Sequence, residues 1–146
     1  RGGKHPWMPP EPSAHLSWAE LACNDGTPYP TAFRTTRLPE LVRAFERIRE
    51  LCGFPLVVNS AYRTEAYNRR IGGAKASQHI EGRALDLCPV KGGAKGLEAL
   101  RKAAQQARAE GLLRGIGIYS GFVHVDTRPG QAATWSGART PEGIGA

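Results

Sequence analysis

The sequence lacks a long apolar run. No hydrophobic stretch in its 146 residues approaches the roughly 18 that a membrane-spanning helix needs, so we expect no segment to cross a membrane. It also lacks the pattern of a secretory signal peptide. Because the chain begins at Arg1 rather than Met, we expect a processed product or a domain of a longer protein.

Cysteine is scarce: the chain has three, Cys23, Cys52 and Cys88, and no C-x-x-C pair. This spacing excludes a thioredoxin-like redox pair and a zinc knuckle. Because the count is odd, at least one thiol is free or pairs outside the chain. We interpret the three as small buried apolar residues, and the count allows one disulfide.

Clusters of positive charge are also missing, although Lys and Arg number 20 against 13 Asp and Glu, a net charge of +7. A basic protein is attracted to polyanions, and both nucleic acid and an anionic cell envelope fit that description. The chain has no Lys/Arg run and no aromatic residues interleaved with arginines. We therefore do not expect nucleic acid as a partner.

The remaining composition is that of a globular protein, with 40% apolar and 23% charged residues, and its 18 Gly and 11 Pro predict many loops. The chain length suits one domain. No internal repeat or domain boundary is visible. We expect an irregular N-terminal arm over residues 1–15 and a single domain over residues 16–146.

Helices and strands are expected in separate runs. The clearest helix is 38–52, which has Pro39 in its first turn and Gly53 after its end. The other elements that we expect are helices at 17–21, 64–70 and 97–111 and strands at 56–59, 83–88, 115–119 and 122–126. We expect the last two strands to form a hairpin. This order predicts an α+β fold, a small antiparallel sheet flanked by helices.

Two candidate metal ligands, His79 and Asp86, lie seven residues apart in the string Ser77-Gln-His-Ile-Glu-Gly-Arg-Ala-Leu-Asp86. Gly82 allows a tight turn between them, and Asp86 lies on the predicted strand that follows. Small Ala84 shares its face of that strand and leaves room beside a metal. A lone His on a loop is usually no ligand, so His79 needs partners.

A third candidate, His124, lies in the strand Phe122-Val-His-Val-Asp126. Alternation places Val123 and Val125 in the core and places His124 and Asp126 together on the other face. Metal ligation by His124, with Asp126 as its orienting group or as a base, would explain an inward-facing polar pair. The alternative is an exposed edge strand that holds both groups in water.

Together these motifs carry a family resemblance. The S-x-H-x-x-G-x-A-x-D string at 77–86, followed by His-x-Asp at 124–126, resembles the D-alanyl-D-alanine carboxypeptidase family of zinc peptidases, whose fold is shared with lysostaphin-type enzymes and the hedgehog domain. The resemblance covers about residues 15–135. Further similar segments lie at 16–23, 59–64, 67–68 and 71–74.

The resemblance implies that His79, Asp86 and His124 hold one Zn²⁺ per chain, with a fourth position for water. It also implies that Arg63 is a catalytic cation on the substrate side, where it would bind a peptide carboxylate or the oxyanion. The alternative for Arg63 is a surface ion pair. We expect further substrate contacts from three residues: Ser77, Gln78 and Trp135.

One position departs from the family pattern. Several relatives have a catalytic Glu or Asp three residues before the last His ligand, where this chain has Gly121. Because Asp126 shares a strand face with His124, we favour it as the general base. Weaker candidates for the base are Glu81, Tyr119 and Asp25.

The expected function is zinc-dependent hydrolysis of peptide bonds in peptidoglycan stem peptides or cross-links. The enzyme would be either a D-Ala-D-Ala carboxypeptidase or a murein endopeptidase of endolysin type. We expect a monomer that acts in the periplasm or the extracellular cell wall, and a phage protein released at lysis fits as well. The alternative, motivated by Gly121, is a zinc-stabilised module that binds cell wall without catalysis.

Overall fold

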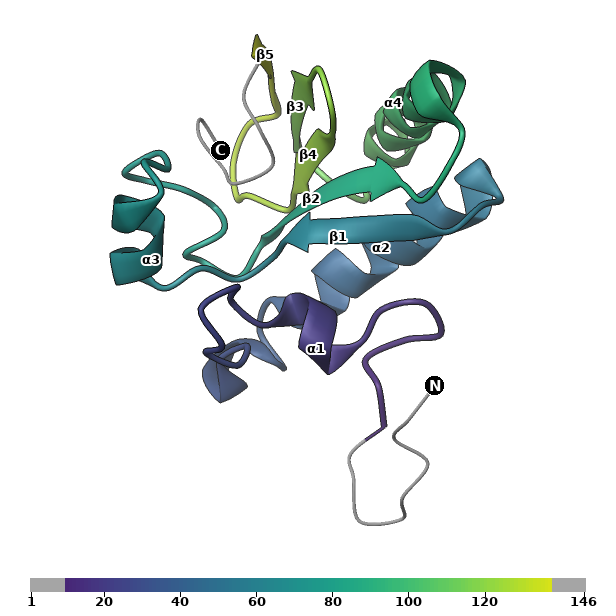
Figure 1. Cartoon of the computed structure of the whole chain (residues 1–146). Helices are drawn as coiled ribbons and strands as arrows, with labels where there is room; N and C mark the ends of the chain where they lie inside the picture. Colours follow the sequence, from purple (N-terminus) through teal and green to yellow (C-terminus); the bar gives the residue numbers. More distant parts are fainter. Residues whose placement is uncertain (1–9, 138–146) are drawn as a thin grey trace.

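A computed structural model describes residues 10–137 of the chain. One mixed sheet forms its centre (Figure 1). The sheet contains five strands: β1 (Leu56–Ser60), β2 (Ala84–Pro89), β3 (Gly115–Tyr119), β4 (Val123–Asp126) and β5 (Ala133–Gly137). The described α-helices are α1 (Trp18–Leu21), α2 (Leu38–Cys52), α3 (Glu65–Arg70) and α4 (Gly93–Ala109). These elements confirm the predicted α+β class.

The spatial strand order is β1-β2-β4-β3-β5. The first three pairings are antiparallel, and they include the predicted β3–β4 hairpin. β5 instead runs parallel to β3, so the sheet is mixed rather than wholly antiparallel. The sequence gives little sign of β5, because this short segment lies in a Gly- and Pro-rich region. It is ordered by backbone pairing with a strand that is distant in sequence.

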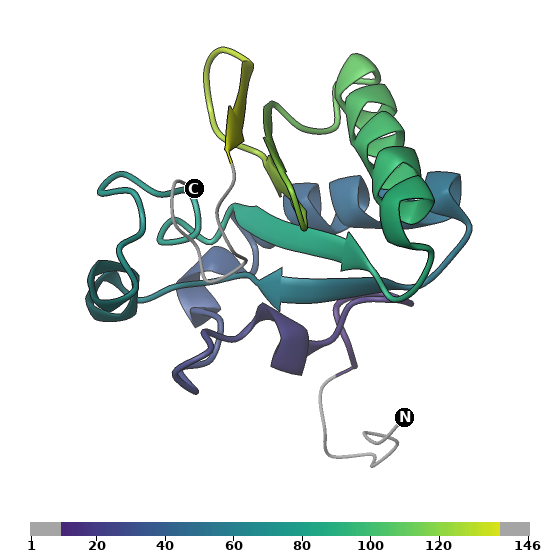
Figure 2. The same cartoon turned by 45° about the horizontal axis from the view of Figure 1, so that its top comes forward.

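The core lies on one face of the sheet, where α2 and α4 pack against each other (Figures 1 and 2). The two valines of β4, Val123 and Val125, are buried in it as predicted. Strand alternation then directs Asp86, His124 and Asp126 to the opposite face. That face is free of the two long helices and can hold a polar site.

Both long helices have glycine at an end. α2 spans the predicted residues and ends at Cys52; Gly53 caps it with a φ of 73°. α4 begins at Gly93, four residues before the predicted start of this helix at residue 97. There, a Cβ on Gly96 would lie 2.9 Å from the carbonyl oxygen of Lys91, so only glycine allows the first turn to close against that loop.

Replacing Ile48 by Ala is expected to lower the free energy of unfolding by about 2–5 kcal/mol, because this fully buried side chain would leave a cavity in the core. Leu51 lies on the same helix but is 37% exposed. Leu51→Ala is therefore the matched control, with an expected loss below about 1 kcal/mol. Urea denaturation of both variants measures the difference, and equal losses would contradict this account of the core.

The prediction that the cysteines are buried is correct for one of the three. All three cysteines are free thiols; Cys23 is buried, while Cys52 and Cys88 are partly exposed. Within residues 10–137, no helix has the length and apolar character needed to cross a membrane.

Candidate metal centre

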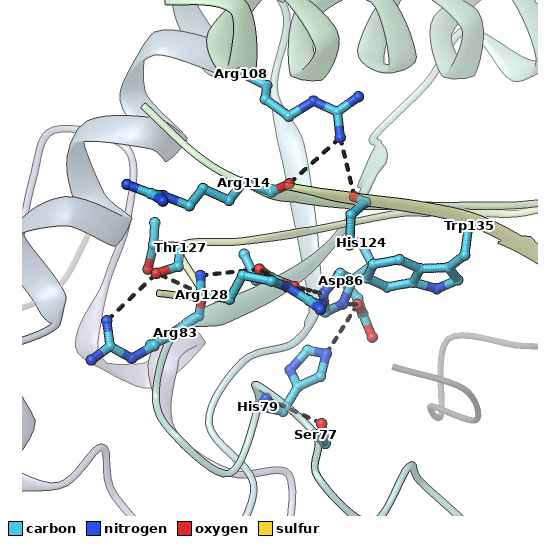
Figure 3. A network of polar contacts seen from close by, with 12 residues as sticks. Ser77, His79, Arg83, Asp86, Arg108, Arg114, His124, Thr127, Arg128 and Trp135 are labelled. Carbon is cyan, nitrogen blue, oxygen red and sulfur yellow. Dashed lines mark hydrogen bonds and ion pairs between the residues drawn. The ribbon is translucent and has the colours of Figure 1, made fainter. Parts of the chain in front are cut away.

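The three predicted ligands meet at one point. His79, Asp86 and His124 each offer one ligand atom, and these atoms lie within 4.8 Å of one another. Figure 3 shows the three side chains converging from a loop, from β2 and from β4. All three are buried, with exposed fractions of 0–1%.

Strand register and one anchored loop produce this convergence. Asp86 on β2 lies directly opposite His124 on β4. His79 enters from the loop before β2, where its carbonyl accepts from the Arg63 backbone N–H at 3.1 Å. The loop turns at Gly82, with φ 69°, and the Gly82 carbonyl accepts from the buried Tyr29 hydroxyl at 2.7 Å. The loop position therefore depends on contacts far away in sequence.

In each imidazole, the nitrogen that points away from Asp86 lies beside a hydrogen-bond acceptor. We call it the outer nitrogen, and its hydrogen bond indicates which tautomer the ring adopts. His79 Nδ1 lies 2.6 Å from the Ala61 carbonyl oxygen, and His124 Nε2 lies 2.7 Å from Asp126 Oδ2. A proton on each outer nitrogen leaves a lone pair on each inner nitrogen.

The inner nitrogens, His79 Nε2 and His124 Nδ1, lie 3.1 and 3.0 Å from Asp86 Oδ1. Three acceptor atoms that face one another in a buried site call for a cation between them. Two imidazole nitrogens and one carboxylate oxygen are a donor set that suits zinc. The residues present therefore fit the metal that the family resemblance implies.

The buried charges shift the pKa values of this cluster in opposite directions. Burial raises the pKa of Asp86, but the imidazoles of His79 and His124 outweigh burial and hold it well below its ordinary value. Burial lowers the pKa of His79. The pKa of His124 is raised, because the neighbouring carboxylates of Asp126 and Asp86 outweigh burial. Asp86 is therefore a carboxylate, the form that binds a cation.

Arg63 holds the second oxygen of Asp86. Its Nη2 donates to Asp86 Oδ2 at 3.2 Å, and its side chain is 0% exposed. The same guanidinium donates through Nε to Ser60 Oγ and through Nη1 to Asn68 Oδ1, both at 3.0 Å. The alternative of a surface ion pair is wrong, because the guanidinium is enclosed by protein.

Asp126 lies on the outer side of the His124 ring. Its Oδ2 accepts from His124 Nε2 and, at 2.7 Å, from Arg128 Nη2, while Oδ1 accepts from Arg128 Nε at 2.8 Å. Burial raises the pKa of Asp126, but Arg128 and His124 outweigh burial and lower it well below its ordinary value. With 1% exposure for both His124 and Asp126, the alternative of an exposed edge strand is wrong.

The predicted substrate contacts differ in their surroundings. Ser77 is buried, and its Oγ accepts from the His79 N–H at 3.1 Å. Gln78 is partly exposed, and its Oε1 is buried without a hydrogen-bond partner. Trp135 is partly exposed on β5, and its ring centroid lies 5.1 Å from that of His124.

The weaker candidates for the base have partners of their own. Glu81 forms an ion pair with Arg37 at 2.9 Å. Asp25 accepts from the Thr27 N–H at 2.9 Å, and that hydrogen bond is the main cause that lowers its pKa to about 2. The Tyr119 hydroxyl accepts from the Trp135 indole at 2.8 Å.

A model of the family described as Peptidase M15 matches residues 14–126, more than half of the chain. The chain belongs to the peptidase M15 family. M15 peptidases are zinc-dependent and include D-Ala-D-Ala carboxypeptidases, which agrees with the predicted resemblance. Comparison with curated proteins finds no match.

The M15 match includes all three candidate ligands and ends at Asp126, so it stops short of Arg128 and Trp135. The sequence reasoning missed Arg128 as a site residue. Strand alternation could have predicted it, because Arg128 is two residues after Asp126, as Asp126 is two residues after His124.

Proposed function

We propose that this M15 peptidase hydrolyses peptide bonds in peptidoglycan stem peptides or cross-links, with one zinc ion held by His79, Asp86 and His124. The convergence of these three buried side chains carries the proposal. When bound, zinc would polarise the scissile carbonyl and lower the pKa of a water molecule to about 7. The net charge of +7 suits an anionic cell wall, in the periplasm or outside the cell.

The protein's own groups prepare the ligands for the metal. The Ala61 carbonyl keeps the His79 proton on Nδ1, and Asp126 keeps the His124 proton on Nε2. Arg63 fixes the Asp86 carboxylate from behind, and its full burial supports a positioning role rather than contact with substrate. Gln78 is the better candidate for substrate contact, because its side chain is partly exposed; the contact would use its exposed atoms and not the buried Oε1.

The contacts of Asp126 support an orienting role rather than that of general base. Both oxygens accept hydrogen bonds, and Arg128 keeps the carboxylate charged. Asp126→Asn is therefore expected to weaken zinc binding about 10–100-fold, the usual effect of losing an outer partner of a ligand. Zinc titration and kcat on the zinc-saturated variant check this. Loss of kcat with unchanged zinc affinity would instead identify Asp126 as the base.

Digestion of purified muropeptides, read by mass spectrometry, tests the proposed activity and identifies the bond. A terminal D-Ala product indicates a carboxypeptidase, and separated cross-links indicate an endopeptidase. Activity should vanish with a zinc chelator and return when zinc is added. Hydrolysis that persists in chelator would contradict the zinc mechanism.

Gly121 supports a second candidate, a zinc-stabilised module that binds cell wall without turnover. Because residue 121 is glycine, this turn offers no catalytic carboxylate where several relatives have one, although a Cβ there would meet nothing within 4 Å. The module would bind zinc and sediment with cell-wall sacculi, and it would release no peptide product. Product release by the wild-type chain excludes this candidate.

A further inference from the structure

We propose that Trp135 is a positioning residue of the metal centre. Its indole on β5 packs against the His124 imidazole across β3, where glycine leaves the backbone without a side chain. The inference rests on the proposed role of His124 as a zinc ligand. It gives Trp135 a function different from a substrate platform. It also explains why β3 has glycine at two alternate positions.

Gly117 makes the contact between Trp135 and His124 possible. In the sheet, Gly117 is paired with His124 on one side and with Trp135 on the other. A Cβ on Gly117 would lie 2.6 Å from Trp135 Nε1, so the indole occupies the space that any other side chain would fill. The rings of Trp135 and His124 therefore meet over β3, at a centroid distance of 5.1 Å (Figure 3).

Gly115, two residues earlier on the same face, makes room for Asp126. The two are directly paired, and a Cβ on Gly115 would lie 2.3 Å from both carboxylate oxygens of Asp126. The Gly115-Ile-Gly117 segment thus presents backbone alone to the metal face, while Ile116 is buried in the core. The two groups that flank His124 depend on these two glycines.

Two further contacts hold the indole in place. Trp135 Nε1 donates to the Tyr119 hydroxyl at 2.8 Å. The Arg128 guanidinium lies over the indole, 5.0 Å from the ring centroid, and also donates to both oxygens of Asp126. Trp135 therefore acts on His124 directly and through the Arg128–Asp126 pair.

Zinc affinity, measured by competition with a chromophoric chelator, is the readout that separates the possible roles. Trp135→Ala is expected to weaken zinc binding about tenfold or more, the size of effect seen when support behind a ligand is lost. Trp135→Phe keeps a ring against His124 and should stay within about threefold of wild type, whereas Gly117→Ala should weaken binding like Trp135→Ala. Ser136→Ala, on an exposed β5 position, is the matched control.

Three measurements on each variant make the outcome decisive: zinc affinity, the melting temperature of the metal-free protein, and KM with kcat at saturating zinc. A raised KM with unchanged zinc affinity would make Trp135 a substrate contact and overturn the proposal. A lower melting temperature with unchanged zinc affinity would reduce it to a packing residue. If Trp135→Ala does not fold, Gly117→Ala and Trp135→Phe still give opposite predictions. Wild-type zinc binding without peptide hydrolysis would remove the proposed function and leave this proposal standing.

Discussion

Asp86→Asn is expected to abolish measurable zinc binding and peptide hydrolysis together. The amide has nearly the shape of the carboxylate, so Arg63 and both imidazoles keep a neighbour of the same size. The negative charge that attracts the cation is lost. Because Asp86 faces both imidazoles through Oδ1, zinc affinity should fall by more than the roughly 100-fold that loss of an outer partner costs.

Zinc titration and muropeptide digestion of the same preparation measure both effects. Glu98→Gln is the control, because Glu98 is an exposed carboxylate on α4 that pairs with Arg101. It should bind zinc and cleave substrate like the wild type. Retention of zinc by Asp86→Asn at wild-type affinity would remove Asp86 from the ligand set.

Arg63→Met is expected to lower the free energy of unfolding by about 3–5 kcal/mol, because it leaves a buried carboxylate without its partner. The loss also leaves Ser60 and Asn68 without the donors that they now accept from. Arg63→Lys should recover part of the stability, because the charge is restored without the planar fork. Urea denaturation of the zinc-free variants measures these differences.

The same variants test the substrate role that the family resemblance implies for Arg63. If Arg63 positions Asp86, Arg63→Lys should weaken zinc binding, while its KM at saturating zinc should stay close to that of the wild type. A large rise in KM with unchanged stability and zinc affinity would show instead that the guanidinium reaches the substrate.

Local sequence patterns predicted the parts of the site that lie within single segments. Spacing and strand alternation suggested His79, Asp86 and His124, and they separated the core valines of β4 from its polar residues. The structure brings the three together through the β2–β4 register, which pairs Asp86 with His124.

The missing parts depend on contacts between distant segments. The irregular composition around Trp135 hides β5, which forms only by parallel pairing with β3. The burial of Arg63 depends on Ser60, Asn68 and Asp86, which lie on three different segments. Sequence periodicity cannot predict such a network, because in the sequence each partner looks like an ordinary polar residue. Only the fold buries these residues together.

The most direct test is a crystal structure of the chain grown with zinc, with anomalous diffraction recorded at the zinc edge. The account predicts one strong peak about 2.0–2.2 Å from His79 Nε2, Asp86 Oδ1 and His124 Nδ1, with the fourth position held by a non-protein ligand. A peak elsewhere, or a fourth ligand supplied by the protein, would contradict a hydrolytic zinc centre at these residues.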